Sequence, residues 1–240
     1  LRIKADNDTT IVGIAVSLSV VMQGWSFAGA VAVNQIDATT WAGIANQSDI
    51  TLAGGTTYGN LDMDADDNGL IVTVAGAVAY GGKGAGIGAS ATINLIDKAV
   101  KAFIENSDIT ASGLVDLLAY SNANIIGIAI AIAGSKGFMA PAISVTVNII
   151  DSTVYAYFNG KKTAGSGIEA AGGVNITASS DPDIITVAGA VGIVAGGEGG
   201  GAVGLSVAYN EIDEDVWAYV NNTDVYASAG DIQLKAKQYS

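Results

Sequence analysis

Residues 70–119 have the sequence LIVTVAGAVAY GGKGAG IGASATINLID KAVKAFIENSDITASGLVDLLA, in which two apolar runs flank a glycine-rich turn. The second run ends in Asn-Leu-Ile-Asp, and shorter runs with every second residue apolar follow it. Alternation of apolar and polar residues is typical of strands with one buried face. The stretch therefore predicts a series of strands joined by turns.

The same block recurs four times along the chain. Its Asn-x-Ile-Asp signature returns at spacings of 60 (34 to 94), 54 (94 to 148) and 62 (148 to 210) residues. A period of this size indicates a solenoid, in which each repeat buries its apolar face against the next one. We expect a single continuous solenoid over residues 1–240, cut from a longer array, with repeats at about 1–60, 61–114, 115–173 and 174–231 and the start of a fifth at 232–240.

Each repeat is expected to contain several strands. In the second copy, the alternating run 61–65 is followed by a polar bend at 66–69 and by the long apolar run 70–80. A glycine-rich turn leads back through the run 87–96, and two apolar runs joined in this way are typical of an antiparallel hairpin. A strand after Asp97 and a short strand near 108–110 complete the coil; in the third copy that short strand falls near Ile168. The predicted fold is all-β, a parallel β-solenoid with large coils of about 54–62 residues that each carry a glycine-turned hairpin.

Composition excludes several classes of function. The chain has 10 basic and 23 acidic residues and a formal charge of −13, which repels phosphates and anionic surfaces. It has no cysteine and no histidine, so disulfides, thiolate metal sites and the commonest general base are absent. The apolar stretch 184–209 is rich in glycine and β-branched residues and is broken by a turn, which argues against a membrane helix. We expect no nucleic-acid partner and no membrane insertion.

Two polar columns would form if each repeat makes one layer. Stacked asparagine amides hydrogen-bond along such an array, and we favour this structural ladder over a ligand-binding role. Its members would be Asn34, Asn94, Asn148 and Asn210.

The second column is acidic. Carboxylates about 5 Å apart repel each other by roughly 1–3 kcal/mol, depending on their exposure to solvent. We favour solvated turn residues, with calcium bridging as the alternative. The acidic stretch 62–69 matches a calcium loop only in part, because Ala75 stands where the motif requires glutamate. The column would contain Asp37, Asp97, Asp151 and Asp213.

Aromatic side chains recur on one face of the strand that follows the Asn-x-Ile-Asp signature. Exposed aromatic side chains can stack on sugar rings or anchor a partner chain. The alternative, which we favour, is that they pair across neighbouring strands and stabilise the sheet. The residues are Trp41, Phe103, Tyr155, Tyr157, Trp217 and Tyr219.

Three successive motifs between residues 100 and 119 carry a resemblance to a known family. The runs Val-x-Ala-x-Ile at 100–104, Asn-Ser-Asp-Ile-Thr-Ala at 106–111 and Gly-x-Val-x-Leu-x-Ala at 113–119 resemble the repeats of large filamentous haemagglutinin-like and leukotoxin-like bacterial surface adhesins. The glycine-rich turn and the Asn-x-Ile-Asp signature extend this likeness over the whole chain. The resemblance implies a right-handed β-helix that is secreted to the cell surface, where it acts as an adhesin or extended filament.

We therefore expect a structural or adhesive module of an extracellular or cell-surface fibre. Its partners would be neighbouring repeats or chains of the same fibre, and glycans or a host surface. An ice- or surface-binding solenoid is an alternative, although regular Thr-x-Thr ladders are absent. A polysaccharide-degrading β-helix is less favoured, because an enzyme needs one singular site and each acidic cluster here is repeated or isolated. We expect no catalytic residue and no cofactor, with calcium as the alternative.

Overall fold

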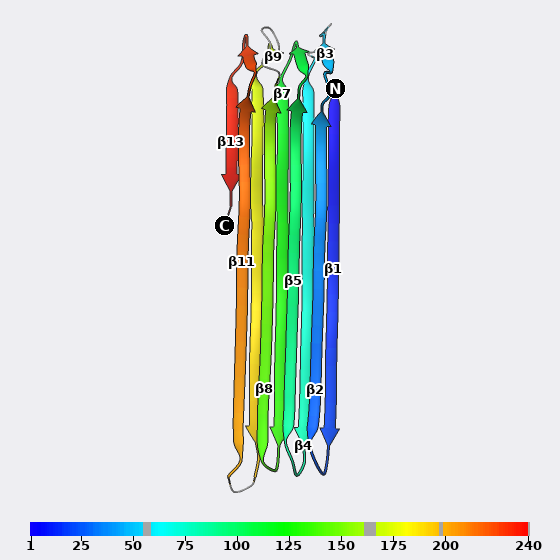
Figure 1. Cartoon of the computed structure of the whole chain (residues 1–240), viewed down its shortest axis with the longest axis vertical. Helices are drawn as coiled ribbons and strands as arrows, with labels where there is room; N and C mark the ends of the chain where they lie inside the picture. Colours follow the sequence, from blue (N-terminus) through cyan, green and yellow to red (C-terminus); the bar gives the residue numbers. More distant parts are fainter. Residues whose placement is uncertain (55–58, 161–166, 197–198, 240) are drawn as a thin grey trace.

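The structure is a computed structural model that describes residues 1–54, 59–160, 167–196 and 199–239. Over these ranges the chain forms thirteen strands, and no helix there is long and apolar enough to cross a membrane. Figure 1 shows an elongated slab in which the long strands run side by side along its length. Glycine-rich turns lie at one end, called the turn end, and short strands at the other.

The strands form three parallel sheets, and each sheet takes one strand from every repeat. Sheet A contains β1 (Arg2–Val21), β4 (Leu61–Gly81), β7 (Val115–Ser135), β10 (Val174–Val194) and β13 (Ile232–Gln238). Sheet B contains β2 (Ser26–Ile44), β5 (Gly86–Glu105), β8 (Met139–Asn159) and β11 (Gly201–Asn221). Sheet C, at the end opposite the turns, contains β3 (Asp49–Leu52), β6 (Asp108–Ala111), β9 (Gly167–Ala170) and β12 (Asp224–Ala227).

Equivalent residues of successive repeats lie directly beside one another. Between β4 and β7 the pairing runs without a bulge from Leu61 with Val115 to Gly81 with Ser135. The same one-to-one pairing continues from β7 to β10. The predicted all-β parallel solenoid is therefore confirmed, and the short strand predicted near Ile168 is present as β9.

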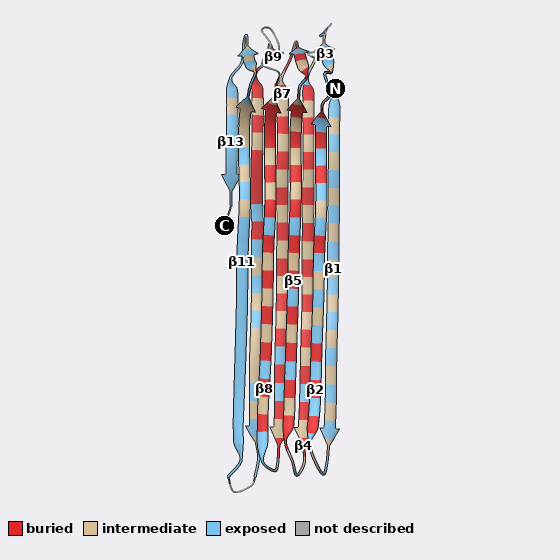
Figure 2. Cartoon of the chain, viewed as in Figure 1, coloured by how far each residue is buried: buried red, intermediate tan, exposed pale blue. Residues whose placement is uncertain are grey.

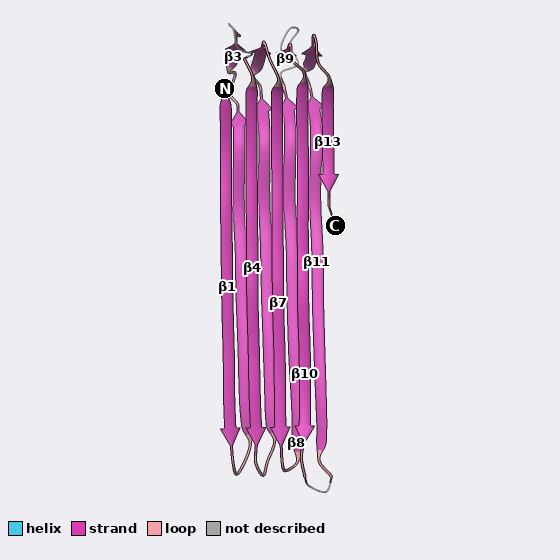
Figure 3. Cartoon of the chain, turned by 180° about the vertical axis from the view of Figure 1, so that it is seen from behind, coloured by secondary structure: helices cyan, strands magenta, loops and turns pink. Residues whose placement is uncertain are grey.

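The predicted polar bend is wrong. Residues 66–69 lie inside β4, which runs unbroken for 21 residues (Figure 3). Parallel neighbours on both sides pair with the backbone throughout, so turn-forming side chains do not interrupt it. For the same reason the runs 87–96 and 97–104 are one strand, β5.

The predicted hairpin also needs correction. The glycine-rich segment reverses the chain as expected, but the strands on either side of it do not pair with each other. Strand β4 pairs with β1 and β7, whereas β5 pairs with β2 and β8. Because the neighbouring repeats already take the backbone groups of both strands, the two strands of one repeat lie in facing sheets and meet through side chains.

The space between sheets A and B is filled differently along the slab. Near sheet C the core contains large side chains such as Leu61, Met63 and Phe158. Toward the turn end it contains mainly alanine, and a Cβ at Gly204 would overlap the backbone oxygen of Ala190. The two sheets therefore approach most closely in the turn half. Figure 2 shows the alternation of buried and less buried residues along the central strands.

Candidate functional surfaces

The four signature asparagines point into the core and form a continuous ladder. The Nδ2 of Asn34 donates to Oδ1 of Asn94 at 3.0 Å, and Asn94 donates to Asn148 at 2.8 Å. Asn148 donates in turn to Asn210 at 2.9 Å. The structure therefore brings these residues together as cross-links between layers, with Asn94 and Asn148 fully buried.

The sheet A positions that face the ladder alternate between two residue types, a feature that the sequence reasoning missed. Thr73 accepts a hydrogen bond from Asn34 at 2.7 Å and donates one to Asn94 at 2.6 Å. Thr186 bridges the next two asparagines in the same way. At Gly127 a Cβ would lie 2.8 Å from the amide oxygen of Asn148, so a side chain is excluded there. The column reads Gly13, Thr73, Gly127 and Thr186.

A buried ion pair lies on the sheet C side of the ladder. The Nζ of Lys98 is 2.8 Å from Oδ1 of Asp67, and both side chains are fully buried. The ammonium also donates to the backbone oxygens of Asp67 at 3.0 Å and Asn122 at 2.9 Å. The other carboxylate oxygen accepts from Thr40 at 2.6 Å and Asn7 at 3.0 Å. Burial lowers the pKa of Lys98, and the hydrogen bond with Asp67 opposes that shift.

This pair is enclosed, and its hydrogen bonds are made within the chain, which makes it structural. In the third repeat, Ser121 occupies the position equivalent to Asp67 and Ser152 the position equivalent to Lys98. The sequence reasoning did not identify the pair. The sequence does indicate that Lys98 is buried, because the alternation of apolar and polar residues places it on the same inward face as Ile96 and Val100.

The four aspartates of the signature lie in register on the outer face of sheet B. All are exposed to solvent. Partial burial raises the pKa of Asp151, and repulsion by Asp97 and Asp213 raises it further. In the described ranges, no three acidic side chains converge in a way that could hold a metal ion.

The acidic stretch 62–69 lies along β4, where its outward residues meet basic side chains of β1. Arg2 Nε lies 3.3 Å from Asp62, and Lys4 lies 3.9 Å from Asp64. The stretch is thus extended and partly paired, and it does not curve around a cavity as a calcium loop does.

The aromatic residues lie on the outer face of sheet B near sheet C. Phe103, Tyr157 and Tyr219 stack along the array with ring centroids 5.6 Å and 4.9 Å apart. Tyr157 is only 7% exposed, and its hydroxyl donates to Glu105 at 2.6 Å. Burial and this hydrogen bond raise the pKa of Tyr157. These three rings are therefore packed as part of the sheet.

The neighbouring column is more open. Lys101 Nζ lies 5.0 Å from the ring centroid of Trp41 and 5.8 Å from that of Tyr155, positions that allow cation–π attraction. Trp41 and Trp217 remain 54% and 57% exposed. This column therefore offers large aromatic surface to a partner.

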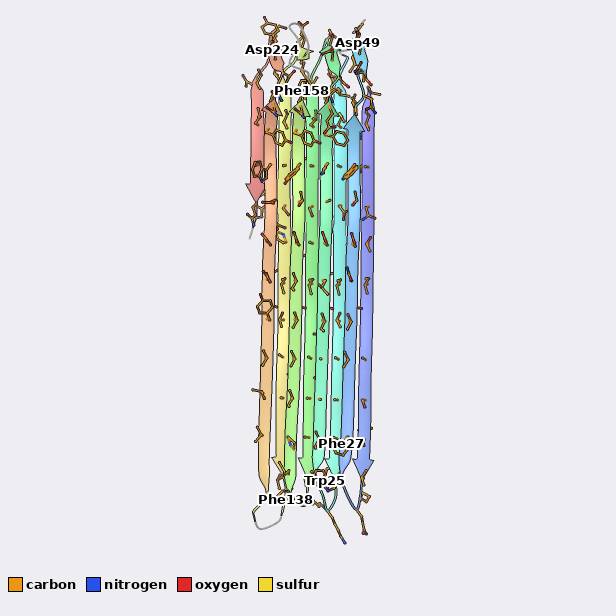
Figure 4. The ribbon with its side chains drawn as sticks, viewed as in Figure 1. Trp25, Phe27, Asp49, Phe138, Phe158 and Asp224 are labelled. Atoms are coloured by element: carbon orange, nitrogen blue, oxygen red, sulfur yellow. The ribbon has the colours of Figure 1, made fainter. Side chains whose placement is uncertain are left out.

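A further surface appears on the outer side of the turn half. Every outward position of sheet A in this region is apolar or glycine, and we call this set of positions the apolar face of sheet A. Exposed Trp25 and Phe138 lie beyond its edge at the turns (Figure 4). The face consists of alternate residues from Val12 to Val20, Val72 to Tyr80, Ile126 to Gly134 and Ile185 to Ile193.

Comparison of the chain with protein-family models, with curated proteins and with solved structures finds no match. Functional inference therefore depends on the geometry of these columns and faces.

Proposed function

We infer that this chain is a structural module of a large extracellular or cell-surface fibrous protein, as its resemblance to the filamentous haemagglutinin-like and leukotoxin-like adhesins implies. The observation that supports this most is the unbroken register of 20 or 21 residues between the long strands of sheet A in successive repeats. Each layer is tied to the next by a complete ladder of backbone bonds and by the asparagine amides. Such a stack resists bending and extension and can be lengthened by adding repeats.

The arrangement of polar groups supports a structural role over catalysis. The asparagine and aspartate columns recur in every layer, and the two aromatic columns do so except at Gly43 and Lys101, whereas an enzyme concentrates acid, base and binding groups at one place. The buried Lys98–Asp67 pair has no counterpart among the described ion pairs, but it is closed to solvent.

Electron microscopy of a concatenated chain tests this proposal. Residues 232–238 pair with β10 as the first strand of a fifth repeat, so residues 1–231 followed by 1–240 join two arrays in phase. We expect straight particles whose stack grows from about 20 to about 40 Å at constant strand length. Globular or bent particles, or turnover of polysaccharides by the purified chain, would contradict the structural role.

An adhesive role is the second candidate, supported by the exposure of Trp41 and Trp217. A glycan array with the wild-type chain and with Trp217→Ala tests it. We expect binding that the substitution weakens, whereas Tyr157→Phe, at a packed ring, leaves binding unchanged. Equal binding by wild type and Trp217→Ala would exclude Trp217 as a contact.

A further inference from the structure

The apolar face of sheet A has the size of a protein interface. Four strands spaced about 4.8 Å apart, each contributing nine residues of about 3.3 Å, cover about 600 Å². Two such faces together would bury about 1,200 Å², the lower end of the range for stable, specific interfaces. On the edge strand Ile14 and Leu18 are each 71% exposed, and in the centre Ile130 is still 41% exposed. An apolar surface of this extent indicates a contact site.

Two glycines within this face have open space above them. Gly76 and Gly189 lie in strand interiors, where glycine is disfavoured, and neither has a positive φ. A Cβ at Gly189 would meet nothing within 4 Å, and one at Gly76 would only reach Val16 at 4.0 Å. Within the described ranges, no contact therefore requires glycine at these positions. Glycine in a strand often marks the close approach of another backbone.

The two glycines alternate with large side chains in one row across the sheet. The register places Val16, Gly76, Ile130 and Gly189 side by side in successive layers. Val16 and Ile130 therefore project from the sheet as knobs, and Gly76 and Gly189 leave holes between and beside them. This alternation repeats every two layers. A reversed copy of the same row would fit it, since each knob would then meet a hole.

We propose that the apolar face of sheet A binds the same face of a second copy, around a two-fold axis that runs parallel to the strands between β4 and β7. This operation places Gly76 opposite the partner's Ile130, and Val16 opposite the partner's Gly189. It also keeps both turn ends together, so that apolar residues meet apolar residues over the whole face. The inference rests on the proposed structural function and names the partner in it.

Backbone chemistry favours a second copy over a lipid bilayer as the occupant. The outer strands β1 and β11 present unpaired backbone groups along their free edges, and hydrocarbon cannot hydrogen-bond to such groups. Face-to-face pairing leaves these edges in water. The net charge of −13 also disfavours anionic bilayers.

The polar halves of the two copies would face each other across water. Outward Asp62 would then oppose the partner's Asp116, and Asp8 the partner's Asp181, which are like charges. Added salt screens this repulsion while leaving the apolar contact intact. Association is therefore expected to strengthen as ionic strength rises.

Sedimentation of variants at the knob-and-hole row tests the proposal. Gly76→Ile fills a hole and should weaken self-association roughly tenfold or more, because both copies of the contact are lost. Gly76→Ile with Ile130→Gly exchanges knob and hole within each chain and should restore it. Gly29→Ile makes the same enlargement on the outer face of sheet B, where an added Cβ also meets nothing within 4 Å, and should leave association unchanged. Circular dichroism establishes that each variant is folded.

Three results would overturn the proposal. The first is a wild-type chain that stays monomeric at all concentrations and salt levels, and the second is self-association of Gly76→Ile equal to wild type. The third is co-flotation with phosphatidylcholine vesicles in place of self-association, which would make the face a lipid contact. A monomeric but straight particle in the electron microscope would remove this proposal and leave the structural function standing.

Discussion

Lys98 and Asp67 lie at the level where the large side chains near sheet C give way to the smaller core of the turn half. Removing one partner of a buried ion pair leaves the other charge without compensation. We predict that Lys98→Met lowers the free energy of unfolding by about 3–5 kcal/mol. Denaturant unfolding measures this loss.

The third repeat supplies the matched control for this pair. Because Ser121 and Ser152 occupy the equivalent positions, Asp67→Ser with Lys98→Ser reproduces a combination that the fold already accommodates. The double variant should lose clearly less stability than Lys98→Met alone. If Lys98→Met left the midpoint of denaturant unfolding unchanged, Asp67 would not be held as a buried charge.

The asparagine ladder gives a second prediction at the residue scale. Asn94 is fully buried, accepts hydrogen bonds from Asn34 and Thr73, and donates to Asn148. Asn94→Ala leaves these groups partly unsatisfied and should cost about 2–4 kcal/mol. Asn210→Ala, at the exposed end of the ladder, should cost about 1 kcal/mol or less by thermal unfolding. Equal losses at the two positions would contradict a ladder whose strength depends on burial.

At the scale of the strand, the aspartate column predicts a dependence on pH. The pKa of Asp151 is raised in the folded chain, so between its unfolded and folded values the folded state binds more protons than the unfolded state. This group's contribution to stability therefore falls as pH rises through that window. Asp151→Asn should raise the melting temperature at pH 7 and have little effect near pH 4.

The same experiment with calcium or a chelator distinguishes repulsion from bridging. If Asp151→Asn instead destabilises the chain at pH 7, and chelation lowers the wild-type melting temperature, the column is bridged by a cation.

Strand order shows how far the sequence could lead. The recurring Asn-x-Ile-Asp signature and the period-two runs were sufficient to predict parallel stacking of equivalent strands. They could not distinguish a hairpin from two facing sheets, because both need two apolar runs and a glycine turn. The two arrangements differ in whether a strand such as β4 pairs with β5 or with β7. The neighbouring repeats determine that pairing.

The same limit explains the wrongly predicted bend and the missed site features. Asp66 to Gly69 has turn-forming residues, but its backbone is paired on both sides and stays extended. Lys98 was overlooked because a charged residue on an inward position becomes interpretable only when Asp67 is seen opposite it. Thr73 and Gly127 alternate against the asparagines across two sheets, a relation with no local pattern in the sequence.

On the scale of the whole molecule, the two halves of the slab bury apolar residues in different places. Near sheet C the large apolar side chains lie inside and charged residues lie outside, as in an ordinary soluble sandwich. In the turn half, the interior is mainly alanine, whereas valine, isoleucine and leucine face outward. A single chain thus leaves apolar surface uncovered on both sheets, and a second copy on the apolar face of sheet A would cover the part that lies on that sheet.

Deleting residues 115–173 tests this organisation, because it joins Leu114 to Val174 in phase and leaves three complete repeats. Strand β4 would then stack on β10, with Asn94 beside Asn210 and Lys98 beside Glu214, so the core columns remain compatible. We predict a folded chain by circular dichroism whose stack is about 4.8 Å shorter by X-ray scattering.

The deletion also sets Gly76 beside Gly189 and removes the Ile130 knob, so sedimentation should show weaker self-association. An unfolded product would mean that the layers do not act as separable units, whereas undiminished association would mean that the alternation of knobs and holes does not determine how two copies meet.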